Sequence, residues 1–281
     1  MHRRTLAAAL VGLVAVIGCR TYNYTSPLGP RYAGAASATA RPVPLTGAPT
    51  LRVVTFNVQY AQHVDRAITL IESSAALRTA DVIALQEMDA PGARRIAEAL
   101  AMSYVYYPAS VAPATGRDFG NAILSRWPIV ADAKIVLPHV ARFRGSERIA
   151  TAATIMVDGV ALRVYSVHLG TKVEIGPGAR RDQVRAILAD AAPYGRVVVG
   201  GDMNSRGIGN AFRAANFLWL TEHDSKTHLF FNWDHIFFRG VAAGDGTHAG
   251  VVRDTLGASD HWPVWAIGVL HPVLNETSGS P

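Results

Sequence analysis

The stretch that decides the fold is V-V-V-G-G-D-M-N-S, from Val197 to Ser205. Three β-branched residues followed by two glycines are typical of a buried strand that ends in a tight turn. Asp202 and Asn204 come next, and on an extended backbone their side chains leave on the same face. A carboxylate beside a carboxamide can hold a water molecule and a phosphoryl oxygen together. The same residues also form ordinary turns, so the rest of the chain has to decide between these interpretations.

Length and composition indicate a folded protein with a substantial core. Of the 281 residues, 49% are hydrophobic and only 17% are charged, a balance that excludes global disorder. The formal charge of +6 permits binding of a polyanion without demanding it, and no basic run indicates a dedicated nucleic-acid tail. The single cysteine, Cys19, excludes an intrachain disulfide framework and a cysteine-based zinc cluster.

The first residues are typical of an export signal. Residues 1–18 combine a basic start with an apolar run that is shorter than the roughly 20 residues needed to span a bilayer. The sequence V-I-G-C resembles a bacterial lipobox, which would make Cys19 a lipidated first residue and hold the protein on a membrane surface of the bacterial cell envelope. An uncleaved anchor, or an ordinary signal that happens to contain a cysteine, is the alternative.

The remaining chain divides into three parts. Residues 19–49, rich in Pro, Ala, Gly, Ser and Thr, predict a lipidated cysteine followed by a flexible tether. Residues 50–270 form the predicted catalytic domain, and residues 271–281 a polar tail. Within the domain we expect helices over 64–77, 93–101 and 179–191, and strands over 51–58, 82–86, 104–107, 122–125, 129–137, 150–157, 161–167, 197–199, 235–238 and 264–269.

The order of these elements favours an α/β fold. Strands and helices alternate at both ends of the domain, but a long run of strands that look antiparallel intervenes. Two β-sheets packed face to face, with helices on the outer faces, therefore fit better than one doubly wound sheet.

Residues capable of chemistry recur where the predicted strands end. One acid at the end of a strand is unremarkable, but a succession of acids, amides and imidazoles is hard to assign to solvation alone. These residues are Asn57, Glu87, His168, Asp202, Asn204, Asp234, Asp260 and His261.

The sequence motifs around these residues resemble those of the endonuclease/exonuclease/phosphatase superfamily. In order they are T-F-N-V, L-Q-E, G-N-A-I-L-S-R-W-P-I, S-V-H-L, G-G-D-M-N, W-D-H-I and S-D-H-W-P, spread over residues 51–269. Each motif alone is a weak signal, whereas the ordered set is a strong one. The resemblance implies a four-layer α/β sandwich of two mixed sheets, a divalent cation, and in-line attack of water on a phosphorus ester.

Residue roles follow from the resemblance position by position. Glu87 corresponds to the principal metal ligand, with Asn57 and Asp260 expected beside the metal. Asp202 and Asn204 correspond to the pair that activates water and holds a phosphate oxygen. His261 corresponds to the catalytic histidine and Asp234 to the acid that orients it. His168 corresponds to a second catalytic histidine of the deoxyribonuclease branch, whose glutamate partner is replaced here by Phe119, next to Asp118.

The chemistry of these side chains supports the same roles independently. An oxygen-rich, cysteine-free set favours Mg²⁺, with Mn²⁺ as an alternative, over zinc. Phosphoryl transfer requires mainly positioning and neutralisation of developing negative charge. A histidine that faces a carboxylate has a fixed tautomer and a raised pKa, which applies to His261 if it meets Asp234.

Several residues keep two interpretations. Asn121 and Arg148 are candidates for contact with the substrate phosphate, or else a turn residue and a solvated edge. His168 can be a buried structural histidine, and Asn57 can cap a turn. His235 is expected to be structural because it alternates to the face opposite Asp234. Among the helix arginines, Arg180, Arg181 and Arg185, one can face the cleft.

Three functions remain open from the sequence. The first is a membrane-anchored, Mg²⁺-dependent phosphodiesterase or nuclease, a monomer that acts on nucleic acid or a lipid headgroup. The second is a phosphomonoesterase or a phospholipid or sphingomyelin hydrolase on the same scaffold. The third is a surface-binding protein with a degenerate site, against which the intact carboxylates argue. Fold alone cannot choose among substrates.

Overall fold

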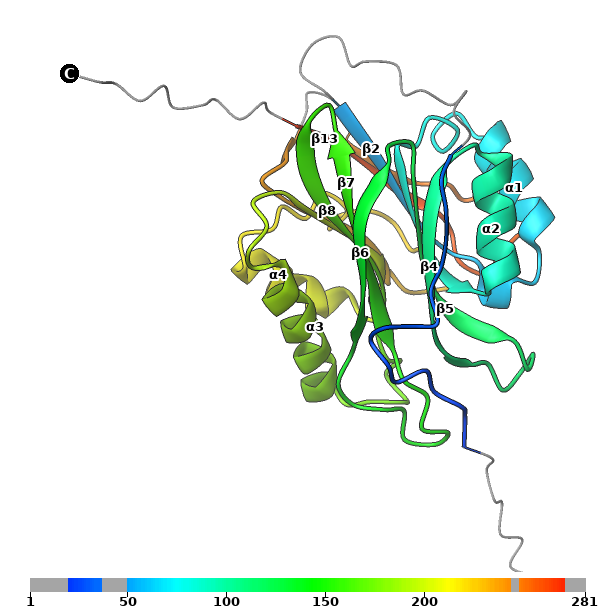
Figure 1. Cartoon of the computed structure of the whole chain (residues 1–281). Coiled ribbons are helices and arrows are strands. Elements are labelled where there is room, and N and C mark those ends of the chain that lie inside the picture. Colours follow the sequence, from blue (N-terminus) through cyan, green and yellow to red (C-terminus); the bar gives the residue numbers. More distant parts are fainter. Residues whose placement is uncertain (1–19, 37–49, 244–247, 271–281) are drawn as a thin grey trace, which may run out of the picture.

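Two mixed β-sheets packed face to face form the centre of the protein, and helices cover both outer faces (Figure 1). The computed structural model describes residues 20–36, 50–243 and 248–270. The predicted signal peptide with Cys19, and the polar tail, lie outside these residues. The predicted α/β sandwich is confirmed.

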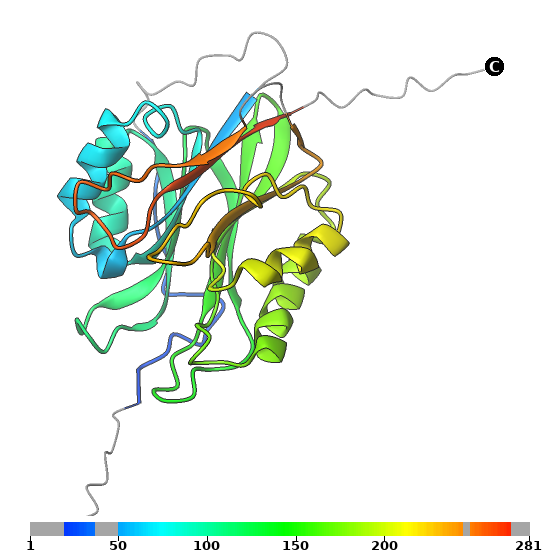
Figure 2. The same ribbon diagram turned by 180° about the vertical axis from the view of Figure 1, so that it is seen from behind.

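The larger sheet has eight strands in the order β1-β4-β5-β3-β2-β13-β11, with β12 also paired to β13. Its two central strands, β2 and β3, run parallel, and the other pairs are antiparallel. Figure 2 shows β13 in red along β2. The last strand of the domain thus pairs with β2, the first strand that the sequence predicts. The bounds are β1 Tyr32–Gly34, β2 Thr50–Asn57, β3 Val82–Met88, β4 Ser103–Val111, β5 Asp118–Ser125, β11 Ala242–Ala243, β12 Ala249–Val251 and β13 Val264–Val269.

The smaller sheet has five strands in the order β10-β9-β8-β7-β6. Only β8 and β9 are parallel, and the helix α3 makes the crossover between them. The bounds are β6 Ile129–Val136, β7 Ile149–Val157, β8 Val160–His168, β9 Val197–Asp202 and β10 Asp234–Arg239.

The central strand β9 is buried on both faces, as its three valines predict. Val198 joins the core between the two sheets, whereas Val197 and Val199 pack under the helices of the outer layer. The glycines that follow are required by close approach. A Cβ on Gly200 would lie 3.3 Å from the Cβ of Ala84 in the other sheet, and one on Gly201 would lie 2.0 Å from the carbonyl oxygen of Val167. Gly200 therefore allows the facing sheet to come close, and Gly201 allows the close approach of β8 within the same sheet, just before Asp202.

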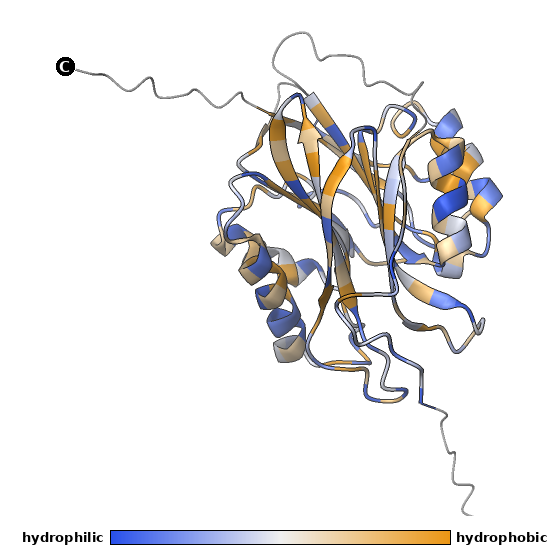
Figure 3. Cartoon of the chain, in the orientation of Figure 1, coloured by the Kyte–Doolittle hydropathy of each residue, from blue (hydrophilic) through white to orange (hydrophobic). Residues whose placement is uncertain are grey.

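The helices bury one face each against a sheet. In α1 the buried residues Val64, Ala67, Leu70 and Ile71 recur at helical spacing, and Figure 3 shows hydrophilic residues on the outward sides. None of the helices in the described residues is long and apolar enough to cross a bilayer. Helices α1 Val64–Ser73 and α2 Ala90–Ala99 cover the larger sheet, and α3 Pro177–Ala191 and α4 Gly209–Ala214 the smaller; the 3₁₀ turns are η1 Gln59–Ala61 and η2 Arg206–Ile208.

The prediction of a free tether before the domain does not hold for residues 20–36. Strand β1 pairs with β4 at the edge of the larger sheet. Upstream of it, the Tyr24 hydroxyl donates to Asp118 Oδ1 at 2.6 Å, and Asn23 Nδ2 donates to the carbonyl oxygen of Gly145 at 2.6 Å. Composition alone missed this because the polar and proline-rich segment docks through hydrogen bonds rather than through an apolar stripe.

A buried polar bridge joins the two sheets beneath the catalytic end. The Gln86 side chain accepts from Thr55 Oγ1 at 3.2 Å in its own sheet. It donates from Nε2 to Ser166 Oγ at 3.0 Å in the other sheet. All three residues are fully buried, so each hydrogen bond replaces one that the group would make with water.

Replacing Gln86 by alanine is expected to lower the free energy of unfolding by about 2–4 kcal/mol. The change leaves a cavity, and the buried Thr55 hydroxyl loses its hydrogen-bond acceptor. Urea unfolding at neutral pH measures this. Gln62, which is exposed, is the matched control, and its alanine variant should differ from the parent by less than about 0.5 kcal/mol. Equal stability of both variants would show that the bridge contributes nothing.

Candidate active site

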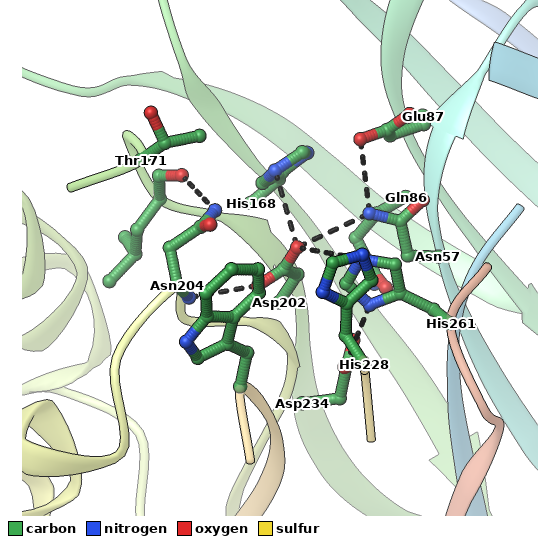
Figure 4. Close-up of polar contacts among 12 residues, drawn as sticks. Asn57, Gln86, Glu87, His168, Thr171, Asp202, Asn204, His228, Asp234 and His261 are labelled. Atoms are coloured by element: carbon green, nitrogen blue, oxygen red, sulfur yellow. Dashed lines mark hydrogen bonds and ion pairs between the residues drawn. The ribbon is translucent and has the colours of Figure 1, made fainter. Parts of the chain in front are cut away.

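The register of the smaller sheet places three predicted site residues side by side. Strands β8 and β9 pair so that His168 lies beside Asp202. Strands β9 and β10 pair so that Asp234 lies opposite Asp202. In the facing sheet, β2 ends at Asn57 and β3 carries Glu87 near its end. Strand ends from both sheets thus bring these side chains to one rim of the sandwich (Figure 4).

Asp202 is the hub of the group. Its Oδ2 accepts from Asn57 Nδ2 at 3.2 Å and lies 3.5 Å from His168 Nε2 and 3.7 Å from His261 Nε2. Its Oδ1 accepts from the backbone N–H of Asn204 at 2.8 Å. Burial and the neighbouring Asp234 charge together raise the pKa of the Asp202 carboxyl to about 7, although His261 opposes the shift.

His261 and Asp234 form the predicted pair. Nδ1 of His261 lies 2.9 Å from Oδ2 of Asp234, and both side chains are buried. Burial works against the charged imidazole, but the carboxylates of Asp234 and Asp202 outweigh it and raise the pKa of His261 to about 10. The ring is therefore an imidazolium at neutral pH, with its Nε2–H directed into the site.

Glu87 is tied to Asp202 through one amide. Asn57 Nδ2 donates to Glu87 Oε1 at 3.1 Å as well as to Asp202, and the Tyr60 N–H donates to Glu87 Oε2 at 3.1 Å. A register shift between Leu85 and Met88 interrupts the pairing of β3 with β5 at this point, and Glu87 has a φ of 58°. Such bulges turn a side chain toward a site. Burial raises the pKa of Glu87.

His168 has a partner that the sequence did not predict. Arg148 Nη1 lies 3.0 Å from both ring nitrogens, and its Nη2 donates to Glu174 Oε2 at 2.9 Å. Phe119 packs against the ring, with centroids 5.6 Å apart. Burial, reinforced by Arg148 and His261, holds the pKa of His168 well below its usual value. The neutral ring can accept from Arg148 at Nδ1 and direct Nε2–H toward Asp202.

Phe119 therefore leaves His168 without the acidic partner that the resemblance implies at this position, although Asp202 lies beside its Nε2. The neighbouring Asp118 does not supply one, because it accepts from Tyr24. The acid in this region is instead Glu174, one residue removed from the imidazole through Arg148. Although burial opposes its charge, Arg148 and the Thr171 N–H lower the pKa of Glu174.

Three other predicted site residues lie at different distances from the polar group centred on Asp202. Asn204 is held beside Asp202 and donates from Nδ2 to the carbonyl oxygen of Leu169 at 2.9 Å. Asp260 lies at the rim, partly exposed, with Oδ2 3.5 Å from His228 Nε2. Asn121 donates from Nδ2 to the carbonyl oxygens of Ile149 and Ser166. Its amide thus spans the two sheets, and a phosphate contact stays a prediction that this geometry does not favour.

A column of stacked rings leads from the surface to His261, and the sequence did not reveal it. Phe231 stacks on Trp233 and Trp233 stacks on His228, whose ring lies tilted against that of His261; the centroids are 4.4 to 4.9 Å apart. His228 lies in a segment without strand or helix periodicity, so no pattern marked it. The possible metal-ligating atoms of His228, Asp260 and His261 lie within 4.8 Å of one another.

Other predicted residues serve the framework. His235 is fully buried on the opposite face, where it accepts from Trp219 Nε1 at 3.3 Å, in agreement with the structural interpretation. Arg180 is buried and donates to the carbonyl oxygen of Gly170, whereas Arg181 and Arg185 are exposed. Trp127 is buried in the core between the two sheets.

The residues present fit a divalent cation. Ligand atoms of Asp202, Asp234 and His261 lie within 4.8 Å of one another, and all three residues are buried. Asp234 Oδ1 is buried without a hydrogen-bond partner among the described residues. Glu87 and Asp202 are carboxylates buried beside one amide, and a hard cation would favour their ionised forms.

A two-sheet sandwich with buried acids and a charged histidine at one rim defines the scaffold of a metal-dependent phosphoesterase. The model of the Endonuclease/Exonuclease/phosphatase family matches residues 54–261. The chain belongs to this family of hydrolases. No curated protein matches the sequence.

Solved structures share the fold at low sequence identity. The endonuclease/exonuclease/phosphatase of Beutenbergia cavernae is 21% identical with a TM-score of 0.62, over 79% of this chain and 72% of that one. D. rerio TDP2, complexed with a single-strand DNA product, is 18% identical with a TM-score of 0.62, over 78% and 98%. The human Nocturnin catalytic domain, with a bound sulfate, is 17% identical with a TM-score of 0.59, over 81% and 97%.

The buried His235 predicts sensitivity to acid. Burial lowers the pKa of its imidazole from 6.5 to about 4. The unfolded chain therefore takes up a proton first as the pH falls below 6.5, and stability decreases down to about pH 4 by about 3 kcal/mol from this residue. In His235→Gln the amide can still accept from Trp219 but cannot be protonated. The free energy of unfolding of this variant should therefore fall less steeply between about pH 6.5 and 4 than that of the parent. Urea unfolding between pH 7 and 4.5 tests it, and parallel curves for parent and variant would contradict it.

Proposed function

We propose that the protein is a Mg²⁺-dependent phosphodiesterase, with Mn²⁺ as an alternative ion, that hydrolyses its substrate by in-line attack of water. The observation that carries the proposal is the buried Asp202 carboxylate. It lies between the imidazolium of His261 and the amide of Asn57, which also holds Glu87. This arrangement puts a proton acceptor, a proton donor and cation ligands at one point.

Asp202 suits the role of general base. A carboxyl whose pKa is about 7 can exist as the acceptor at neutral pH and still have the basicity to take a proton from water. Asn204 is fixed beside it by the hydrogen bond to Leu169, so its amide can orient the water or a phosphoryl oxygen. The new bond to phosphorus then forms opposite the bond that breaks.

His261 suits the stabilisation of charge. Its Nε2–H can donate to a phosphoryl oxygen as negative charge develops there, while Asp234 keeps the ring protonated and oriented. Glu87 and Asn57 are the residues that would hold the cation, with Asp202 beside them as the base. When bound, the cation would neutralise phosphoryl charge and help to orient the substrate.

Space near the site favours a diester over a monoester. One cavity of about 440 Å³ is lined by Tyr60, Phe119 and Arg148. Another of about 470 Å³ is lined by Lys172, Phe231 and Trp233. Arg148, in the first lining, contacts His168, whereas Trp233, in the second, is separated from His261 by the ring of His228. A phosphodiester has two substituents to place, and these two cavities give room for them.

Arg148 supports recognition of an anion in the first cavity. Its Nε is buried and has no hydrogen-bond partner in the described part of the chain. A phosphate group or a second anionic substituent would satisfy this donor. D. rerio TDP2 and Nocturnin, which share the fold, have been solved with a DNA product and with sulfate.

We further infer that the protein is a lipoprotein of the bacterial cell envelope, attached through Cys19 and active as a monomer. The support is the lipobox-like V-I-G-C after a basic and apolar start. Mass spectrometry of protein extracted from membranes tests it, and an unmodified Cys19 would end this part of the proposal.

The function predicts EDTA-sensitive cleavage of at least one diester. Plasmid DNA, bis-p-nitrophenyl phosphate, sphingomyelin and phosphomonoesters, each with Mg²⁺ or EDTA at fixed salt, form the panel. Hydrolysis of monoesters alone would replace the phosphodiesterase with a phosphomonoesterase. Activity that is equal with and without EDTA would contradict a role for the cation.

Single changes at the hub should stop catalysis without unfolding the protein. Asp202→Asn removes the proton acceptor and His261→Ala removes the proton donor, so each should lower the rate by about 10²-fold or more. Asp158→Asn and His223→Ala, at exposed positions, are the matched controls. Near-full activity in the first two variants, with unfolding midpoints unchanged, would show that these roles are wrong.

A further inference from the structure

Exposed apolar and basic side chains are concentrated on the loops around the catalytic end. Among the described large hydrophobic residues, four are more than 70% exposed, and three of them are Phe143, Val173 and Phe230. Arg144, Lys172 and Lys226 are exposed on the same loops. These six residues are called the basic apolar rim below. Single exposed hydrophobic residues need no explanation, but a cluster that includes basic residues marks an interaction surface.

The loops of the basic apolar rim are physically connected. The N–H of Arg142, next to Phe143, donates to the carbonyl oxygen of Glu174, next to Val173, at 3.1 Å. Lys172 Nζ lies 5.3 Å from the ring centre of Phe231, next to Phe230. Lys226 Nζ lies 5.3 Å from the ring centre of Phe230 itself. The rim is therefore one continuous surface along the two cavities that flank the catalytic group.

The charge of the rim is complementary to an anionic surface. None of Arg144, Lys172 and Lys226 takes part in an ion pair within the described residues. The acid nearest to Lys172 in sequence, Glu174, is occupied by Arg148. Basic groups beside exposed aromatic and aliphatic side chains are the combination that binds anionic lipid interfaces. The basic groups contact the anionic headgroups, and the apolar side chains enter the boundary of the acyl chains.

The start of the described chain lies on this same rim. The Thr21 N–H donates to the carbonyl oxygen of Arg144 at 3.0 Å, and the Arg20 guanidinium approaches Gly145. Figure 1 shows the dark blue start of the described chain beside the loops at the bottom, whereas β13 is labelled near the top. Cys19 is the next residue. A lipid on Cys19 would therefore be joined to the residue directly before Arg20 and Thr21, which dock beside Arg144 and Gly145.

We propose that the basic apolar rim seats the catalytic end on an anionic phospholipid bilayer, so that the site faces the lipid headgroups. The surface requires only the exposed side chains and the docked segment. It gains a second attachment if Cys19 carries a lipid, as in the proposed localisation. Two attachments on one face fix an orientation that a single anchor leaves free. Because binding is measured without catalysis, failure of this proposal and failure of the proposed phosphodiesterase are distinguishable.

A fluorescent probe tests the orientation directly. Cys19→Ser removes the only cysteine, so Val173→Cys or Val130→Cys in this full-length chain can be labelled with a polarity-sensitive probe. Both valines are exposed, at 71% and 56%, and Val130 lies at the other end of β6 from the rim. With vesicles of phosphatidylcholine and phosphatidylglycerol, emission from position 173 should shift to shorter wavelength while emission from position 130 stays unchanged. Equal responses, or none at 173, would overturn the proposal.

A binding comparison gives a second readout. In the Cys19→Ser chain, the combined change Phe143→Ser, Val173→Ser and Phe230→Ser should weaken co-sedimentation with the same vesicles by about tenfold or more. The control carries Val130→Ser and Leu28→Ser, both exposed and away from the rim loops, and should bind as the parent does. Binding of single-stranded DNA that responds to the triple change, with vesicle binding unaffected, would instead make the rim a nucleic-acid surface and overturn the lipid proposal.

Discussion

The burial of the Asp202 carboxylate is the constraint on which the site depends. A buried charge is costly unless it is paired or coordinated, and three elements satisfy it here: Asn57 from the facing sheet, His261 from the loop before β13, and the backbone of Asn204. Gly200 allows this because no side chain holds the sheets apart just before Asp202. The close contact of the sheets and the chemistry at their rim are therefore consequences of the same short sequence.

The sequence revealed those parts of the site that lie on strands. Asp202, Asp234 and His168 follow or begin buried runs, and the register of one sheet brings them together without further assumptions. The two-sheet architecture followed from the same alternation. Contacts made by irregular backbone were not accessible. The bulge that turns Glu87 inward, the docking of residues 20–36, and the position of His228 depend on loops, where no hydrophobic period exists to be recognised.

The surroundings of His168 show how one substitution changes the electrostatics of a site. With Phe119 beside the ring, Asp202 is the one carboxylate near His168 in the described part of the chain, and burial together with the guanidinium of Arg148 opposes an imidazolium. The two histidines thus differ in charge at neutral pH although both lie beside Asp202, because His261 also has Asp234 on its second nitrogen. Such a division separates a neutral hydrogen-bond donor from a cationic one. A phosphoryl group bound between them would meet the imidazolium of His261 on one side, and on the other a neutral His168 backed by Arg148.

Glu174 connects this electrostatic arrangement to the outer surface. Its carboxylate holds Arg148 against His168, while its backbone carbonyl bonds the loop that carries Phe143. Lys172 and Val173, directly before it, belong to the basic apolar rim. The rim is therefore connected to Arg148 through covalent neighbours and two hydrogen bonds. Because Arg148 lines the cavity beside the site, the same turn that meets the interface also shapes the space in which a substrate is held.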